Sequence, residues 1–207
     1  MGRIAIVLAT ASLGVLVGAV SLHVARDEPA YSFAAASAAG AVALLVAGWA
    51  LIGVGLASRF RRFGLIAAAA GIAWFLLEWN NPGIGSPLAF TVGLVFYAAC
   101  PALVGHAVLA YPSGRLRSHL ERAVVGVAYA GSMVVLGLLP ALFFDPQAQE
   151  GCSACPRNIL LMADRAGAVD ELNRVGVVLG LAWSVALAAL AARRARSAVP
   201  AGGAVYM

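Results

Sequence analysis

Long uncharged stretches alternate with short groups of charged residues along the whole chain. The six longest intervals between charged residues hold 15 to 36 uncharged residues, and a helix needs about 20 apolar residues to cross the hydrocarbon core of a bilayer. This pattern predicts an all-α integral membrane protein, a bundle of six transmembrane helices. The predicted spans lie near residues 4–24, 32–57, 63–80, 87–111, 123–144 and 175–192.

Local features shape three of these spans. The span near 63–80 is short and is followed by the turn Asn80–Gly83. Trp79 lies at its end, and Trp is typical of the membrane interface. Pro101 lies inside span 87–111 and is expected to kink it, because proline removes a backbone donor. The first apolar stretch is longer than the core of a signal peptide, so we expect a retained helix.

The charged residues predict the orientation of the bundle. With the N-terminus inside, the inner segments carry ten Arg and one Glu, whereas the outer segments carry four Arg and eight acids. Short Arg-rich loops stay on the cytoplasmic side, so both termini are predicted to be cytoplasmic in a multi-pass protein of the cell membrane. The inner arginines taken as topology anchors are Arg59, Arg61, Arg62, Arg193, Arg194 and Arg196.

Composition supports the same class. Hydrophobic residues make up 62% of the 207 residues and charged residues 11%, with a mean hydropathy of +0.91. Soluble domains carry about 25% charged residues, so a water-soluble enzyme is excluded. The net charge of +5 follows from the orientation of the helices, so the predicted partner is the lipid bilayer and not a nucleic acid.

The inner loop 112–122 has a definite turn chemistry. Pro-Ser-Gly favours a tight turn, and Ser118 followed by Glu121 forms a capping-box pattern that predicts a helix start at the inner surface. One interpretation is a membrane-edge turn with Arg anchors; the other is a coupling loop that contacts a cytoplasmic domain. The candidate coupling residues are Tyr111, Pro112, Ser113, Gly114 and Arg115.

The outer loop 145–174 contains the pair Cys152 and Cys155. An extracytoplasmic C-x-x-C favours a disulfide, which serves either as a staple that closes a turn or as a redox or sensing element. A tetrahedral zinc site takes four ligands and one C-x-x-C supplies two, so no metal is expected. Apolar residues that recur every three or four positions predict a short amphipathic helix over 157–172.

Other chemistry is sparse. Cys100 is expected to be a packing residue, and His106 a neutral side chain bonded to a carbonyl. The chain contains no phosphate-binding loop, no nucleophile elbow and no paired intramembrane carboxylates. No catalytic, cofactor-binding or metal-binding residue is predicted.

The two loops together resemble a known family. The run from Leu109 to Leu116, then Tyr129, then Cys152-x-x-Cys155-Pro156-Arg157-Asn158 with Leu160-Leu161 resembles the N-terminal membrane region of a group of actinobacterial two-component sensor histidine kinases. The resemblance covers about residues 105–165. By resemblance, Pro156 and Asn158 are motif residues.

The resemblance implies a sensory or input module in a phosphorelay. In such kinases a dimerisation helix with a phospho-accepting His and an ATP-binding domain follow the membrane region, so ATP, a response regulator and homodimer formation are implied through those domains. His119 lies in a membrane-edge loop and is not that acceptor. Residues 1–196 are expected to form the transmembrane domain and 197–207 a cytoplasmic tail or truncation point, in either an excised input region or a stand-alone relative.

Two alternatives come from other classes of protein. A membrane thiol-disulfide oxidoreductase would use the outer C-x-x-C, although such enzymes relay electrons through a second cysteine pair and Cys100 stands alone. The other alternative is a small transporter or structural membrane protein.

Overall fold

The computed structural model describes residues 2–28, 32, 37–150 and 153–198. All regular secondary structure within these residues is helical. The elements in chain order are α1 (Gly2–Asp27), α2 (Ala38–Ala57), α3 (Arg61–Leu76), η1 (Pro82–Ile84), α4 (Pro87–Phe96), α5 (Ala99–Ala110), α6 (His119–Tyr129), η2 (Ala130–Leu138), α7 (Leu139–Ala141), α8 (Pro146–Gln149) and α9 (Ala166–Ala198).

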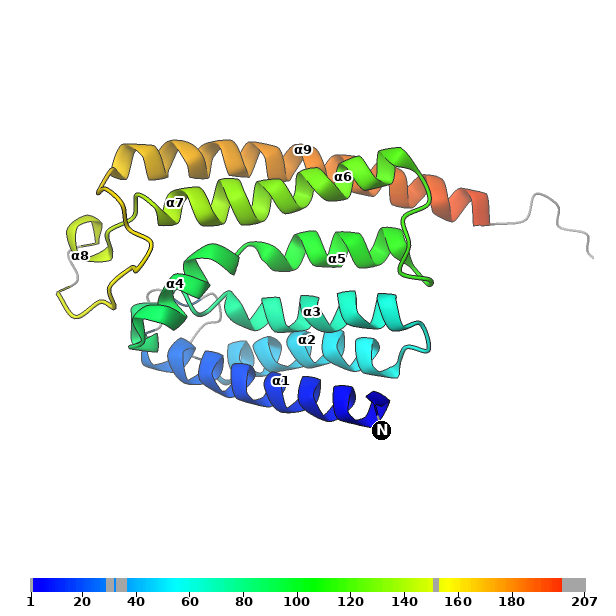
Figure 1. The fold of residues 1–207 in the computed structure, drawn as a ribbon, viewed down its shortest axis with the longest axis horizontal. Helices are drawn as coiled ribbons and strands as arrows, with labels where there is room; N and C mark the ends of the chain where they lie inside the picture. The colour runs from blue at the N-terminus through cyan, green and yellow to red at the C-terminus, as the bar shows by residue number, and fades with distance from the viewer. Residues whose placement is uncertain (1, 29–31, 33–36, 151–152, 199–207) are drawn as a thin grey trace, which may run out of the picture.

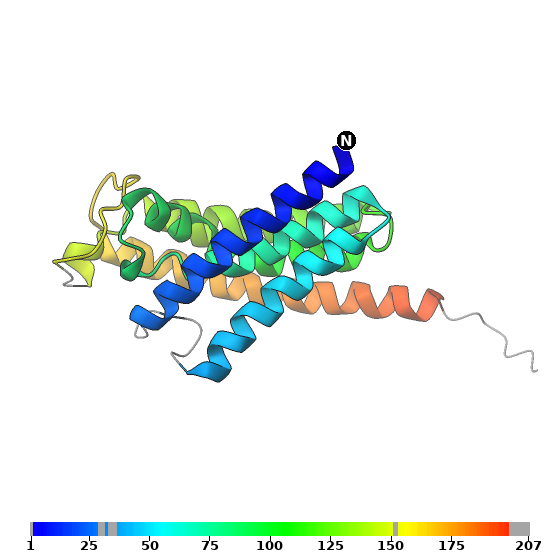
Figure 2. The same cartoon turned by 90° about the horizontal axis from the view of Figure 1, so that it is seen from below.

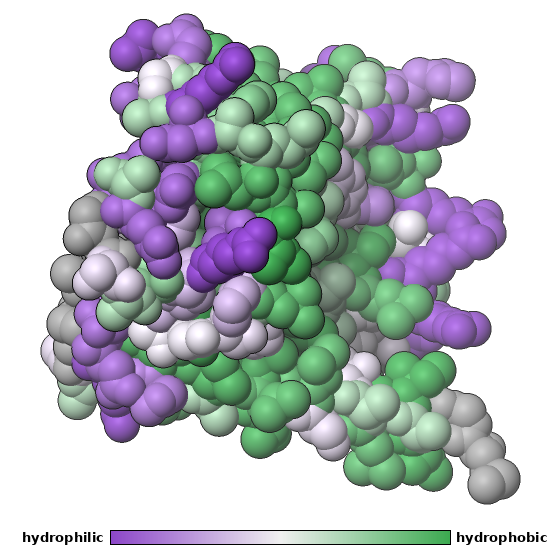
Figure 3. Space-filling model, turned by 60° about the vertical axis from the view of Figure 1, so that its left-hand side comes forward, coloured by the Kyte–Doolittle hydropathy of each residue, from purple (hydrophilic) through white to green (hydrophobic). Residues whose placement is uncertain are grey.

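The long helices lie side by side along one axis, and their connections alternate between two ends (Figure 1). The N-terminal turn of α1, the α2–α3 and α5–α6 connections and the C-terminal turns of α9 lie at one end. We call it the arginine end, after Arg59, Arg61, Arg62, Arg115, Arg117, Arg122, Arg193, Arg194 and Arg196. Hydrophobic side chains gather between this end and the hydrophilic opposite end (Figure 3).

The all-helical class is confirmed, whereas the count of six spans stays a prediction. Four helices are long and apolar enough to cross a membrane, and a fifth span is added if α4 and α5 count as one. The helix at the predicted span 63–80 is α3, which has 16 residues and ends at Leu76. At a rise of 1.5 Å per residue, α3 is about 24 Å long, short of a hydrocarbon core of about 30 Å.

This short helix is nevertheless at the centre of the fold. It packs against α1, α2 and α5, and small residues allow the close contact with α2. A Cβ added at Gly55 of α2 would lie 2.6 Å from the Gly64 carbonyl oxygen of α3. Helices in lipid gain stability from such close van der Waals contact.

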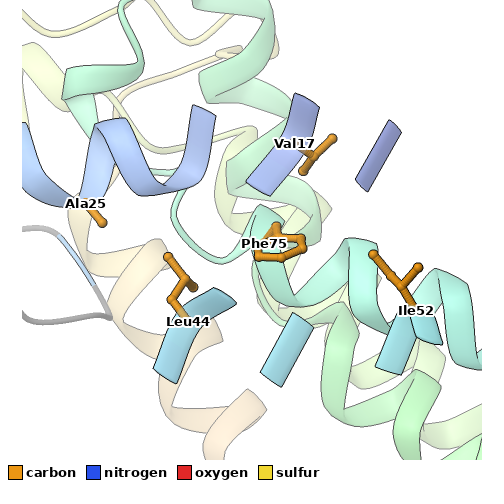
Figure 4. Packing of buried hydrophobic residues seen from close by; sticks show 5 residues of the cluster. All are labelled: Val17, Ala25, Leu44, Ile52 and Phe75. Carbon is orange, nitrogen blue, oxygen red and sulfur yellow. The ribbon is translucent and has the colours of Figure 1, made fainter. Parts of the chain in front are cut away.

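Phe75 of α3 fills the space between α1, α2 and α3. Its side chain is fully buried and lies among Val17 and Ala25 of α1 and Leu44 and Ile52 of α2 (Figure 4). The same ring leaves no room for a side chain at Gly48. One large ring opposite glycine therefore sets the spacing of the first three helices.

The predicted kink of the fourth span is present. α4 and α5 form a broken pair bent by 47°. Pro101 occupies the first turn of α5, where its missing N–H costs nothing, but the ring prevents α4 from continuing into α5. The proline therefore turns one long apolar stretch into two short helices.

The outer loop departs from the predicted amphipathic helix over 157–172. The segment before Ala166 is not helical, and α9 then continues without a break through the predicted span 175–192 to Ala198. The backbone N–H groups of Met162 and Ala163 donate to the Leu142 carbonyl, and that of Arg165 donates to the Phe143 carbonyl. These bonds to the end of α7 replace the helical bonds that the apolar spacing predicted.

Candidate functional site

The predicted capping box at the start of α6 is present. The Glu121 N–H donates to Ser118 Oγ at 3.1 Å, and Glu121 Oε2 accepts from the backbone N–H groups of Arg117 at 2.6 Å and Ser118 at 3.2 Å. The carboxylate thereby satisfies donors that a helix start leaves without intrahelical partners. It also fixes the end of the α5–α6 loop.

Arg194 of α9 holds the same carboxylate. Its Nε donates to Glu121 Oε1 at 2.9 Å and its Nη2 to Glu121 Oε2 at 3.1 Å, while Nη1 donates to the Leu109 carbonyl of α5. The exposed fraction of the Glu121 side chain is 8% and that of Arg194 is 22%. We call Arg194, Glu121 and the Leu109 carbonyl the Arg194 junction.

The Arg194 junction joins three elements. The Arg194 guanidinium, carried by α9, binds Glu121 at the start of α6 and the Leu109 carbonyl at the end of α5, in a planar arrangement that only arginine provides. Removing Arg194 would leave the Glu121 carboxylate, which is shielded from solvent, without its counter-charge, and this destabilises the fold. The junction therefore fixes the position of α9 at the arginine end.

The candidate coupling loop contacts the other side of the bundle. The ring of Tyr111 packs edge-on against Phe63 of α3, with 5.4 Å between the ring centroids. Gly114 has a φ of +74°, a conformation that favours glycine. A Cβ at Gly114 would also collide with the backbone of Phe63 and with Arg62, so a glycine is needed there for two reasons.

The loop between Tyr111 and Ser118 thus bridges two parts of the bundle. Its first residue packs against the start of α3, and its last residues, Arg117 and Ser118, donate to the Glu121 carboxylate that Arg194 also binds. The turn between these two contacts contains Pro112, Ser113 and Arg115. Within it, the Arg115 N–H donates to Ser113 Oγ at 3.3 Å. Of the arginines predicted to be topology anchors, only Arg194 belongs to the Arg194 junction. Its ion pair with Glu121 was not predicted from the sequence.

A signal for that pairing was present in the sequence. Glu121 is the only acid among the ten arginines of the inner segments, so any ion pair within these segments has to use it. Spacing alone could not choose the partner, because Arg193, Arg194 and Arg196 lie within about one turn of α9 and the pair that forms spans 73 positions of the sequence.

At the opposite end, Asn158 fastens the outer loop to the bundle. Its Nδ2 donates to the carbonyls of Ala141 at 2.6 Å and Phe144 at 2.8 Å, and its Oδ1 accepts from the Leu160 N–H at 3.0 Å. Asn158 is buried, as is Pro156. The motif residues given by resemblance therefore lie inside the loop and are not accessible to a ligand.

The outer loop also contacts α4. The Ile159 N–H donates to Thr91 Oγ1 at 3.0 Å, and Thr91 is buried. α4 is the short helix before the Pro101 bend, so this bond joins the outer loop to the segment on one side of that bend. The role of Thr91 was not predicted, because a single Thr in an apolar stretch usually bonds within its own helix.

The cysteines divide into two kinds. Cys155 is disulfide-bonded and buried, whereas Cys100 is free and buried in α5. Cys152 lies outside the described residues, so the predicted pairing with Cys155 stays a prediction. Among the residues that the structure describes, no group of three His, Cys, Asp or Glu side chains could hold a metal ion.

Two further polar contacts lie within the bundle. His106 of α5 forms a hydrogen bond of 2.9 Å with the Tyr129 hydroxyl of α6, in place of the predicted carbonyl partner. Glu78, at the end of α3 opposite the arginines, is fully buried and accepts from Ser32 Oγ at 2.8 Å. Both contacts join residues that are distant in the sequence.

No protein-family model, no curated protein and no solved structure matches this chain.

Proposed function

We propose that the chain is the membrane-embedded input module of a two-component sensor histidine kinase, with six spans and the arginine end in the cytoplasm. The observation that carries the proposal is the Arg194 junction. It fastens the candidate coupling loop and the start of α6 to α9, the helix that would lead into a kinase core.

The contacts at the opposite end supply a route for a signal. The outer loop is bonded to α4 through Thr91 and to the end of α7 through Asn158. Movement of that loop would change how α4 packs on α7 and how α7 packs on α9, whose position at the arginine end the junction fixes. A switch of this kind needs two alternative arrangements of the same contacts.

A fusion tests the coupling. Residues 1–196 are joined to the dimerisation and ATP-binding core of a characterised sensor kinase, and autophosphorylation is measured in membranes. We expect Arg194→Gln to change the activity by about fivefold or more, as typical coupling energies imply. Glu121→Gln should change autophosphorylation in the same direction. The change in the double variant should be much smaller than the sum of the two single changes, because both substitutions remove the same contact.

Arg193→Gln is the matched control. It removes the same charge from the neighbouring position, and Arg193 has no ion pair among the described side chains. Equal autophosphorylation in the Arg194→Gln and Arg193→Gln fusions, both inserted and folded, would contradict the coupling role. The genomic reading frame past codon 207 gives a second test: a phospho-accepting His and ATP-binding motifs support the proposal, and a stop codon far from any regulator gene counts against it.

A further inference from the structure

A cavity of about 430 Å³ lies at the arginine end between α1, the end of α2 and the start of α3. Its walls are mostly apolar and include Val7 of α1, Leu56 of α2 and Leu65 and Ala68 of α3. Arg59 and Arg61, at the α2–α3 turn, line the same cavity. The cavity therefore combines apolar walls with guanidinium groups at one end.

The cavity follows from the way α1 crosses its neighbours. Gly14 and Gly18 bring α1 close to Ile52 and Phe75, and α1 crosses α2 and α3 at an angle (Figure 2). Towards its N-terminus α1 loses close contact, and the side chains of Ile4 and Ile6 are 71% and 43% exposed. The space is thus a wedge that is narrow at the glycines and open at the arginine end.

The charge at the open end is not neutralised within the described part of the protein. Neither Arg59 nor Arg61 has an ion pair among the described residues, and Arg59 lies 4.9 Å from the Phe60 ring centroid. Glu121, the only acid of the inner segments, is already held by Arg194. An occupant with an anionic group would pair with these arginines.

We propose that this cavity binds one anionic phospholipid, with its phosphate at Arg59 and Arg61 and an acyl chain along the apolar wall between α1 and α3. Arginine suits phosphate because its planar donors bind two oxygens at once. Basic pockets between membrane helices on the cytoplasmic side bind anionic headgroups. The inference rests on the membrane location in the proposed function and does not require signalling.

The test measures bound lipid on the full chain. Protein purified from nanodiscs of mixed phosphatidylglycerol and phosphatidylcholine is examined by native mass spectrometry. We expect one phosphatidylglycerol to be retained in preference to phosphatidylcholine. Arg59→Gln with Arg61→Gln should weaken retention by about fivefold for each arginine.

Two comparisons complete the experiment. Arg193→Gln with Arg196→Gln removes the same charge at the same end outside the cavity and should keep the lipid. Thr10→Phe fills the cavity from α1 and should displace the lipid while both arginines remain. Equal retention of the two lipids, or equal loss in both double variants, would overturn the proposal. Because no kinase output enters the measurement, its failure leaves the fusion result unaffected.

Discussion

At the scale of single residues, buried polar side chains mainly serve backbone groups. Glu121 accepts two backbone N–H groups, and Asn158 bonds three backbone groups in the outer loop. A buried backbone group without a partner costs more than a hydrogen bond gains. These side chains therefore decide where helices start and how loops close.

Asn158→Ala is predicted to loosen the outer loop. It leaves the Ala141 and Phe144 carbonyls without their donor, which costs about 1–3 kcal/mol for a buried group. Thermal unfolding in detergent and the rate of proteolysis within residues 153–165 measure the effect. Arg157→Ala, an exposed neighbour, is the control; equal stability of the two variants would refute the capping role of Asn158.

At the scale of elements, the lengths of the uncharged runs predicted which segments are helical but not every helix boundary. The runs between charges located every long helix, and Pro101 predicted the bend between α4 and α5. The non-helical segment before Ala166 was missed because its bonds go to Leu142 and Phe143, which are distant in sequence. Apolar spacing carries no information about such tertiary partners.

Pro101→Ala is predicted to reduce the 47° bend. The restored N–H can donate to the Tyr97 carbonyl four residues before it, which favours one continuous helix. Spin labels on Leu88→Cys and Val108→Cys, exposed positions of α4 and α5, should move apart in distance measurements by electron paramagnetic resonance. Pro87→Ala, at the first position of α4, should leave the distance unchanged. An unchanged distance in Pro101→Ala would show that packing, not the proline, sets the bend.

At the scale of the whole molecule, the distribution of charge predicted which segments share one end of the bundle, whereas hydrophobicity located only the helices. The segments with most arginines, separated widely in sequence, lie at one end of the bundle (Figure 1). The positions of candidate site residues were predicted in part. The capping box was local and therefore visible, whereas the Arg194–Glu121 pair spans 73 positions and depends on packing that no spacing rule gives.

Orientation is tested by labelling in intact cells. Cys introduced by Met162→Cys, at a side chain 77% exposed in the outer loop, should react with a membrane-impermeant maleimide. Cys introduced by Arg117→Cys at the arginine end should react only after the cells are permeabilised, because Arg-rich loops are retained inside. The reverse pattern would overturn the proposed orientation.

The length of α9 has a geometric consequence for anything joined to it. Its 33 residues make a helix about 50 Å long, and its C-terminal turns extend beyond the other helices at the arginine end (Figures 1 and 2). Each residue of an α-helix adds about 100° of rotation. Because Arg194 binds α9 to the bundle, the number of helical residues after it decides which way an attached domain would face. One residue inserted after Arg194 would rotate such a domain by about 100° about the helix axis.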